Sequence, residues 1–250
     1  MPRGSSVWKK QKSIKLSCAI KKLPRREAFC LSEGFMKQYD LIFDIDGTIW
    51  DSCEAVHDSW RESLRKRYGC FGSPSIEQVR SIMGKAPDEI AQLLFSRFGS
   101  NARAVFDALS EDECAYLAAN GAALYPAVPE TLRKLSLQHR LFIVSNCQAG
   151  YLEALYAATG LGSCFEDARC AGVTGLDKAG NLCTLIRDRA LENVCFIGDT
   201  EGDESAAREA GCAFIHAAYG FGSAKAPDAV LRSFTELPDL IRTLEEDDHV

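Results

Sequence analysis

The sequence predicts an α/β protein with a doubly wound, mainly parallel sheet and a small all-helical cap inserted near its start. The first observation is a set of short apolar runs typical of buried parallel strands. These runs lie at residues 41–45, 141–145, 194–198 and 213–216. The second is that segments of helical length follow or separate them, at residues 148–159, 178–190 and 205–211. Strands that alternate with helices form βαβ units, which build parallel sheets.

The third observation is an interval between Asp51 and Pro126 that breaks the alternation. It contains no convincing strand and is typical of helices at residues 54–68, 76–83, 87–98 and 111–120. Ser75 and Ser110 each begin a capping-box pattern, which predicts a helix start. We therefore expect a helical cap at residues 52–125, well placed to act as a lid over a site. The core then comprises residues 38–51 and 126–250.

Composition and charge narrow the class of protein. Apolar residues make up 46% and charged residues 26% of the chain, as in ordinary globular domains. The net charge is −6, but residues 1–37 carry ten Lys/Arg and two Glu (+8), which leaves −14 for residues 38–250. Such an acidic domain is not expected to bind nucleic acid by neutralising phosphates. No apolar run approaches the ~18–20 residues that span a membrane, so we expect no membrane partner and a cytoplasmic location.

The basic segment at residues 1–37 has no sustained periodicity. We expect it to be a disordered extension on which nothing catalytic depends. An organelle-targeting segment and an artefact of start-site choice are the alternatives.

The eleven cysteines are an odd number and include no C-x-x-C pair. This argues against a disulfide framework and against a zinc cluster. Free, mostly buried thiols in a reducing compartment are the expectation.

The stretch from Phe43 to Ile49 carries the strongest functional signal. It places Asp44 and Asp46 at the end of an apolar strand and then breaks the strand with Gly47. Asp-Gly is also a common hairpin turn. In open α/β sheets, however, ligands bind just beyond the carboxyl ends of the strands. This position therefore favours a site.

Two further strand ends and one helix start supply complementary groups. Ser145 and Asn146 follow the strand at 141–145, and Asp199 and Asp203 follow the strand at 194–198. Lys178 begins a helix between them. If the strands are neighbours, all these side chains converge on one edge of the sheet.

So many carboxylates at one edge require a cation. Two carboxylates about 5 Å apart repel by roughly 3 kcal/mol at an effective dielectric constant of about 20. Hard oxygen ligands with room for water suit Mg²⁺. Three carboxylates, Mg²⁺ and one lysine sum to about zero charge if Asp46 is protonated. Such a site accepts a phosphate dianion, and the like charges help to raise the pKa of Asp46.

Taken together and in this order, the motifs resemble those of the haloacid dehalogenase superfamily over roughly residues 39–222. The run Asp44-Ile45-Asp46-Gly47-Thr48 matches its first motif, Ser145 the second, Lys178 the third, and Asp199 with Asp203 the fourth. The helical insertion resembles the cap of the phosphoglycolate phosphatase and β-phosphoglucomutase branch.

The resemblance implies a mechanism. Asp44 is the implied nucleophile, which forms an aspartyl-phosphate, and Asp46 the implied general acid and base. Mg²⁺ would be held by the Asp44 and Asp199 carboxylates and the Asp46 carbonyl, with Asp203 supporting them. The implied phosphate-binding groups are Ser145, Lys178 and the backbone N–H groups of Gly47 and Asn146.

We therefore expect a Mg²⁺-dependent phosphomonoester hydrolase for a small phosphorylated metabolite, acting as a monomer or homodimer. A sugar phosphomutase is the close alternative, because it shares the aspartyl-phosphate. A receiver-like phosphorylated switch and a non-catalytic binding protein are remoter ones. Lys85 lies between two expected cap helices, where it either contacts the substrate or is a solvated loop charge; both interpretations stay open.

Overall fold

The computed structural model describes residues 38–247. The extension expected at residues 1–37 lies outside the described residues. At the centre of the fold is a six-stranded sheet in the order β5-β4-β1-β6-β7-β8, and every neighbouring pair is parallel. The strands are β1 (Asp40–Phe43), β4 (Leu141–Ser145), β5 (Asp167–Cys170), β6 (Val194–Gly198), β7 (Ala213–Ala217) and β8 (Ala229–Leu231). The predicted doubly wound α/β fold is confirmed.

Strand β1 lies between β4 and β6, so that Phe43 pairs with Ile143 on one side and with Ile197 on the other. This register places the ends of the three central strands side by side. The sequence did not predict β5 or β8. β8 has only three residues, and no residue of β5 except Cys170 is fully buried. Neither strand therefore shows the apolar run that marks a buried one.

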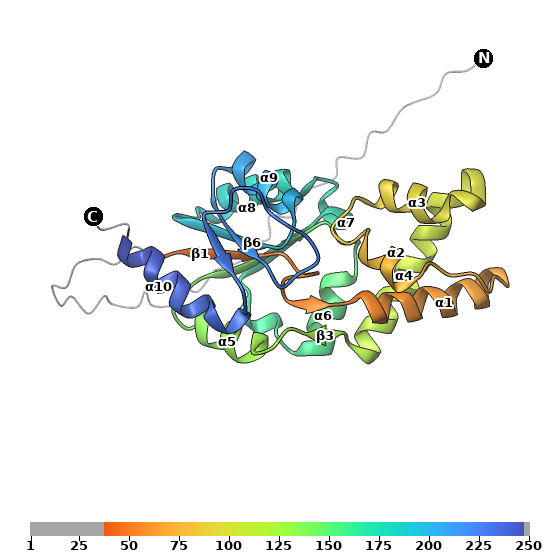
Figure 1. The fold of residues 1–250 in the computed structure, drawn as a ribbon, viewed down its shortest axis with the longest axis horizontal. Helices are drawn as coiled ribbons and strands as arrows, with labels where there is room; N and C mark the ends of the chain where they lie inside the picture. The colour runs from red at the N-terminus through yellow and green to blue at the C-terminus, as the bar shows by residue number, and fades with distance from the viewer. Residues whose placement is uncertain (1–37, 248–250) are drawn as a thin grey trace, which may run out of the picture. The chain divides into compact units, whose positions relative to one another are not determined.

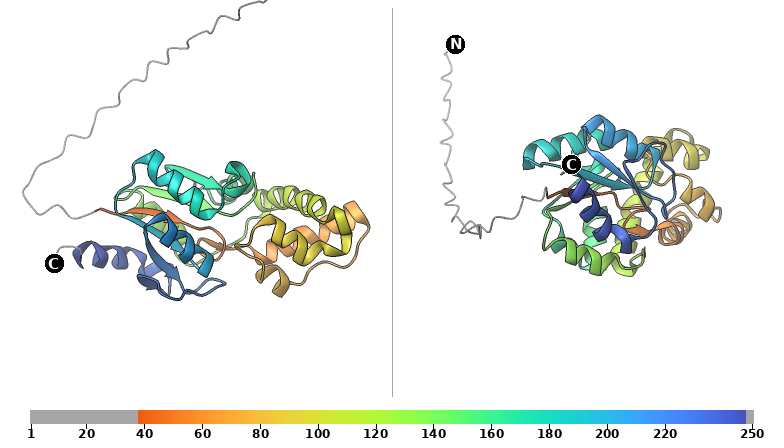
Figure 2. Two further views of the ribbon diagram at one scale, coloured as in Figure 1. Left: turned by 90° about the horizontal axis from the view of Figure 1, so that it is seen from above. Right: turned by 60° about the vertical axis from the view of Figure 1, so that its left-hand side comes forward.

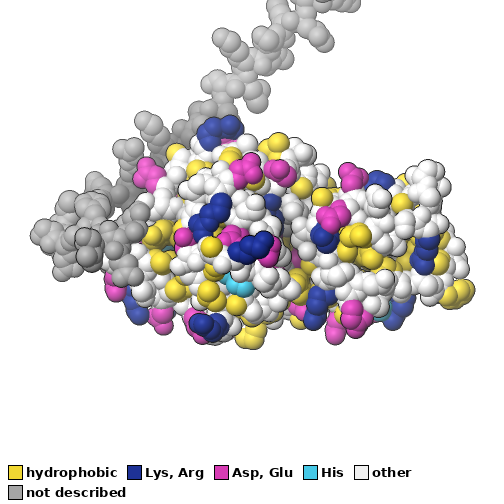
Figure 3. Space-filling model, turned by 45° about the horizontal axis from the view of Figure 1, so that its top comes forward, with side chains coloured by type: hydrophobic (Ala, Val, Ile, Leu, Met, Phe, Trp, Pro, Cys, Tyr) yellow, Lys and Arg dark blue, Asp and Glu magenta, His cyan; other side chains and the backbone are white. Residues whose placement is uncertain are grey.

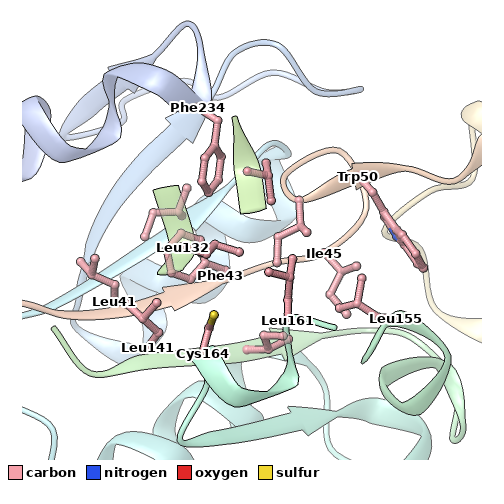
Figure 4. Close-up of a cluster of buried hydrophobic side chains, with 14 of the residues drawn as sticks. Leu41, Phe43, Ile45, Trp50, Leu132, Leu141, Leu155, Leu161, Cys164 and Phe234 are labelled. Atoms are coloured by element: carbon pink, nitrogen blue, oxygen red, sulfur yellow. The ribbon is translucent and has the colours of Figure 1, made fainter. Parts of the chain in front are cut away.

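Helices cover both faces of the sheet (Figure 1). One face packs against α5 (Val128–Leu135), α6 (Tyr151–Thr159) and α10 (Leu237–Asp247). The other packs against α8 (Lys178–Arg189) and α9 (Glu201–Ala210), with the short α7 (Ala171–Thr174) nearby. Successive strand residues point to opposite faces, so Leu41 and Phe43 belong to the first layer and Ile42 to the second. Figure 4 shows Phe43 in the first layer near Phe234, with ring centroids 6.1 Å apart.

Four further helices form the cap and have an apolar core of their own. They are α1 (Cys53–Tyr68), α2 (Ile76–Arg80), α3 (Pro87–Phe95) and α4 (Ala102–Asn120), with the 3₁₀ segment η1 (Ser96–Asn101) between the last two. Trp60, Phe95 and Phe106 make edge-on and tilted ring contacts at its centre. In Figure 2 these helices lie beyond one end of the sheet. The all-helical cap is thus confirmed as part of the fold.

Some local predictions were wrong. The capping box at Ser75 is present, but Ser110 lies inside α4 and is buried. The preceding residues, Ala102 to Leu109, are mostly good helix formers, so the helix begins at Ala102, nine residues earlier than expected. Helix α9 begins at Glu201 rather than Ser205, because Thr200 caps it. The antiparallel pair β2 (Trp50–Asp51) and β3 (Ala123–Leu124), which flanks the cap, was not predicted.

Candidate active site

The residues singled out in the sequence lie together at the carboxyl ends of β1, β4 and β6. Asp44 follows β1, Ser145 is the last residue of β4, and Asp199 follows β6. The parallel register aligns these ends on one edge of the sheet, as expected for an open α/β fold. The structure thus brings the candidate core residues into one neighbourhood.

Asp44 lies at the bottom of this site, with only 2% of its surface exposed. Its backbone N–H donates to the Ile197 carbonyl at 2.9 Å, which continues the β1–β6 ladder and fixes the direction of the side chain. Its Oδ1 lies 3.0 Å from Lys178 Nζ, close enough for an ion pair but outside hydrogen-bond geometry. Burial raises the pKa of Asp44, and the charge of Lys178 opposes that rise.

Lys178 is the first residue of α8 and is itself buried. The Asp177 side chain caps this helix by accepting a hydrogen bond from the Gly180 N–H at 2.8 Å. A cation at a helix N-terminus is disfavoured by the helix dipole, but the ammonium here contacts both Asp203 and Asp44. Burial alone would lower the pKa of Lys178; the two carboxylates outweigh it and raise the pKa. Lys178 therefore stays charged.

Asp203 is wholly buried and already saturated with partners. Its Oδ2 accepts hydrogen bonds from the Thr200 hydroxyl at 2.7 Å, the Thr200 N–H at 3.0 Å and the Asp199 N–H at 3.2 Å. Its Oδ1 accepts from Lys178. Asp203 thus fixes the turn that carries Asp199 and fixes the ammonium.

Asp199 is held by backbone groups, and one of its oxygens is left free. Oδ2 accepts from the Phe221 N–H at 2.7 Å and the Gly222 N–H at 3.3 Å, whereas Oδ1 is buried without a hydrogen-bond partner. Burial and the neighbouring Asp203 raise the pKa of Asp199 to about 7. A Cβ on Gly47 would lie 2.2 Å from Asp199 Oδ2, so this close approach requires glycine.

This arrangement fits a hard divalent cation. Asp44, Asp199 and Asp203 each offer an oxygen, and these oxygens all lie within 4.8 Å of one another. Three carboxylates face a single ammonium, and buried charges of one sign are costly. The free Oδ1 of Asp199 and the unsaturated Oδ1 of Asp44 are the natural ligand atoms. Oxygen ligands in this number suit Mg²⁺.

Asp46 has a different environment, although it lies only two residues from Asp44. Its Oδ1 accepts hydrogen bonds from the Ser52 hydroxyl at 2.5 Å, the Tyr151 hydroxyl at 2.6 Å and the Trp50 Nε1 at 3.0 Å. Burial raises the pKa of Asp46, and these donors limit the rise. Since Oδ1 already accepts three hydrogen bonds, a proton on this carboxyl resides on Oδ2.

The remaining candidates divide between the two sides of the site. Ser145 is buried, and its hydroxyl accepts from the Cys147 N–H at 3.3 Å. The Asn146 side chain donates to the Gly84 carbonyl in the cap at 2.9 Å. The Gly47 N–H donates to the Trp50 carbonyl at 3.0 Å. This N–H is therefore already hydrogen-bonded within the protein. Gly47 contributes to the site because it has no side chain that would collide with Asp199.

A pocket joins these core residues to the cap. Its empty space, open mouth included, is about 550 Å³. Asp44, Asp46 and Ser145 line its core side. Lys85 lines the cap side and forms an ion pair with Glu89. Buried Glu113 also lines it and contacts Trp60 and Gln148.

Sequence reasoning missed several residues of this site. Tyr151, Trp50 and Ser52 hold Asp46, and Glu113 and Gln148 connect cap and core. The signal for Trp50 and Ser52 was their place just after the first motif. Glu113 was visible only as one half of the capping box that does not form.

The family model for haloacid dehalogenase-like hydrolases matches residues 41–217. The chain belongs to this family. Among curated relatives of this hydrolase, the phosphoglycolate phosphatase of Vibrio parahaemolyticus is 28% identical over 82% of the chain and 98% of the relative. That of Rhodobacter capsulatus is 29% identical over 80% of the chain and 95% of the relative.

Solved structures show the same fold. A haloacid dehalogenase-like family hydrolase from Streptococcus pneumoniae superposes with a TM-score of 0.66 at 23% identity. The match covers 81% of this chain and 98% of that structure. Because the chain belongs to a family of hydrolases, the alternative of a receiver-like phosphorylated switch is disfavoured.

Two further findings concern the described residues alone. None of their helices is both long and apolar enough to cross a membrane. No disulfide links any of their nine cysteines. On the face seen in Figure 3, the Lys and Arg side chains alternate with Asp and Glu rather than gathering in one basic patch.

Proposed function

We propose that this hydrolase is a Mg²⁺-dependent phosphomonoesterase that acts on a small phosphorylated metabolite through an aspartyl-phosphate. The observation that carries the proposal is the contrast between two neighbouring carboxyls. Asp44 contacts the buried ammonium of Lys178, and Asp46 receives three hydrogen bonds on one oxygen. The relatives named as phosphoglycolate phosphatases favour a phosphate ester as substrate.

In the proposed first step, an Asp44 oxygen attacks phosphorus and the bond to the leaving oxygen breaks. Asp46 delivers the proton that it holds on Oδ2 to that oxygen. In the second step, Asp46 takes a proton from a water, which attacks the phosphoryl group and restores free Asp44. Each step leaves Asp46 in the protonation state that the next one needs.

The proposed phosphate-binding groups are Lys178, the Ser145 hydroxyl and the backbone N–H of Asn146. Donors and cations fixed in advance around the transferring group stabilise the charge that builds up there. Lys178 is fixed by Asp203, so its ammonium needs no reorganisation during the reaction.

Mg²⁺ fits the oxygens of Asp44 and Asp199 and the backbone carbonyl of Asp46, and Asp203 would support this set by fixing Lys178 and the Asp199 turn. When bound, the ion would neutralise charge and polarise the phosphoryl group. The fully partnered oxygens of Asp203 favour an indirect part in metal binding.

We propose that residues 52–125 form the cap that closes over the site and that Lys85 lies at the rim of the leaving-group pocket. A cytoplasmic location is proposed as well, because no disulfide links the described cysteines. A monomer or homodimer would suffice, since all the site residues named here come from one chain.

Release of inorganic phosphate from a panel of phosphomonoesters, with Mg²⁺ and with a chelator, tests the proposal. We expect release that requires the metal and falls by about 10³-fold or more in Asp44→Asn. Asp58→Asn, at a half-buried carboxylate on α1 outside the pocket, is the matched control. Transfer of phosphate between sugar positions without net release would favour the mutase. No release and no transfer would overturn the proposed function.

A further inference from the structure

Glu113 is a buried carboxyl in the pocket without a cationic partner. It lies on α4 with 4% of its surface exposed. Trp60 Nε1 donates to Oε2 at 2.6 Å, and Gln148 Nε2 donates to Oε1 at 2.8 Å. No Lys, Arg or His among residues 38–247 forms an ion pair with it. Each carboxylate oxygen accepts about two hydrogen bonds, so one position remains on each.

The surroundings of Glu113 on the cap side are apolar. Val56, Trp60, Ile82, Met83, Ile90 and Phe106 line the pocket there. A buried carboxyl among apolar groups loses its proton at a cost unless a positive charge pairs with it, and burial accordingly raises the pKa of Glu113 to about 7. Gln148 and Trp60 supply hydrogen bonds but no charge.

The pocket is also poorly suited to an anionic leaving group. Lys85 is the only cation among the described residues that line it, and Glu89 already neutralises Lys85. A carboxylate placed in the cap side would meet Glu113 and no unpaired cation. A cation placed there would instead meet an unpaired carboxyl, that of Glu113.

We infer that Glu113 is a specificity-determining residue and that the leaving group carries a protonated amine on a short apolar body. The ammonium pairs with Glu113, and the alkyl or ring carbons lie against the apolar side chains of the cap. This inference rests on the proposed phosphomonoesterase function and narrows its substrate class to phosphorylated amino alcohols. The inferred substrate class differs from the substrate in the names of the relatives, because glycolate carries a carboxylate where Glu113 favours a cation.

The experiment compares esters of matched shape. The first series consists of ω-aminoalkyl phosphates with two to four methylenes. The second consists of n-alkyl phosphates of equal length, which carry no charge on the leaving group. The third consists of the corresponding ω-carboxyalkyl phosphates and includes phosphoglycolate. p-Nitrophenyl phosphate reports hydrolysis without any leaving-group charge. The variants are Glu113→Gln and, as control on the same helix, Glu111→Gln, whose side chain is exposed. Circular dichroism checks that each variant is folded.

We expect wild type to prefer at least one amine over its alkyl analogue by about tenfold or more in kcat/KM, as for a charge-assisted hydrogen bond. Glu113→Gln should lower that ratio by a similar factor, and Glu111→Gln should keep it. An equal loss on all esters would show that Glu113 only fastens cap to core and would overturn the inference. So would a wild-type preference for carboxylates, which needs no variant to detect. If even p-nitrophenyl phosphate is not hydrolysed, the proposed function itself fails.

Discussion

At the scale of single residues, most carboxylate oxygens of the site already accept hydrogen bonds from the protein, and only a few are left without partners. Asp203 has both oxygens engaged, Asp199 has one engaged, and Asp46 has three donors on one oxygen. The backbone amides of the loop at 220–222 orient Asp199 without adding a side chain to the site. We therefore expect the chemistry at the oxygens that face the pocket and the proposed metal.

Gly47→Ala tests the close approach between the first motif and Asp199. Gly47 has φ +81°, and a Cβ there would lie 2.2 Å from Asp199 Oδ2. We expect kcat to fall by about 100-fold or more, because the shift of Asp199 displaces the proposed metal ligand. Gly202→Ala is the control, since its Cβ would meet nothing closer than 3.5 Å. Unchanged kcat in Gly47→Ala would refute the claim that the close approach of Gly47 to Asp199 holds the proposed metal ligand in place.

Glu113 makes stability depend on pH in a predictable direction. Burial raises its pKa from 4.5 to about 7 in the folded state. Between these values the unfolded chain loses the proton and the folded chain keeps it, so wild type loses stability as pH rises from about 4.5 to about 7. The loss is on the order of 3 kcal/mol.

Thermal denaturation across this pH range measures the effect. Glu113→Gln cannot ionise and should lose less stability than wild type as pH rises, whereas Glu111→Gln should follow wild type. Parallel curves for wild type and Glu113→Gln would contradict the buried-carboxyl account.

At the scale of elements, β1 connects the core to the site. Its residues are fully or almost fully buried, and it leads directly into Asp44. The sequence was sufficient to predict β1, β4, β6 and β7, because buried parallel strands appear as continuous apolar runs. It was not sufficient for β5 and β8, or for the start of α4. Those depend on pairing and packing partners that are distant in the sequence.

Phe43→Ala tests how much of the stability depends on this strand. Phe43 is wholly buried and its ring lies against those of Phe165 and Phe234. We expect a loss of about 3–5 kcal/mol in the free energy of unfolding. Phe71→Ala, at a side chain 88% exposed, should change it by less than about 0.5 kcal/mol. Similar losses in both variants by chemical denaturation would contradict the packing described here.

At the scale of the whole molecule, the residues proposed for chemistry come from the core and those proposed for specificity come mainly from the cap. The motifs identified the first group in the sequence, because their order and spacing repeat across a family. Glu113, Trp60 and Gln148 have no such signature. Their proximity arises only when α1, α4 and the loop after β4 pack together. Substrate selection was therefore much less visible in the sequence than catalysis.

Removal of residues 1–35 should leave kcat/KM within about twofold, because every site residue lies between Asp44 and Gly222. Steady-state hydrolysis of p-nitrophenyl phosphate by the full and shortened chains measures this. A large loss would show that the basic segment contributes to the site.

The central claim is that Asp44 carries the phosphoryl group and Asp46 moves the protons. The most direct test is the reaction of Asp46→Asn with p-nitrophenyl phosphate and Mg²⁺, followed by rapid mixing and mass spectrometry. Nitrophenolate leaves without an acid, whereas the second step needs a base. We predict a burst of about one nitrophenolate per enzyme and one added HPO₃ on the peptide that contains Asp44. Steady turnover without a burst, or phosphate on another residue, would contradict the account.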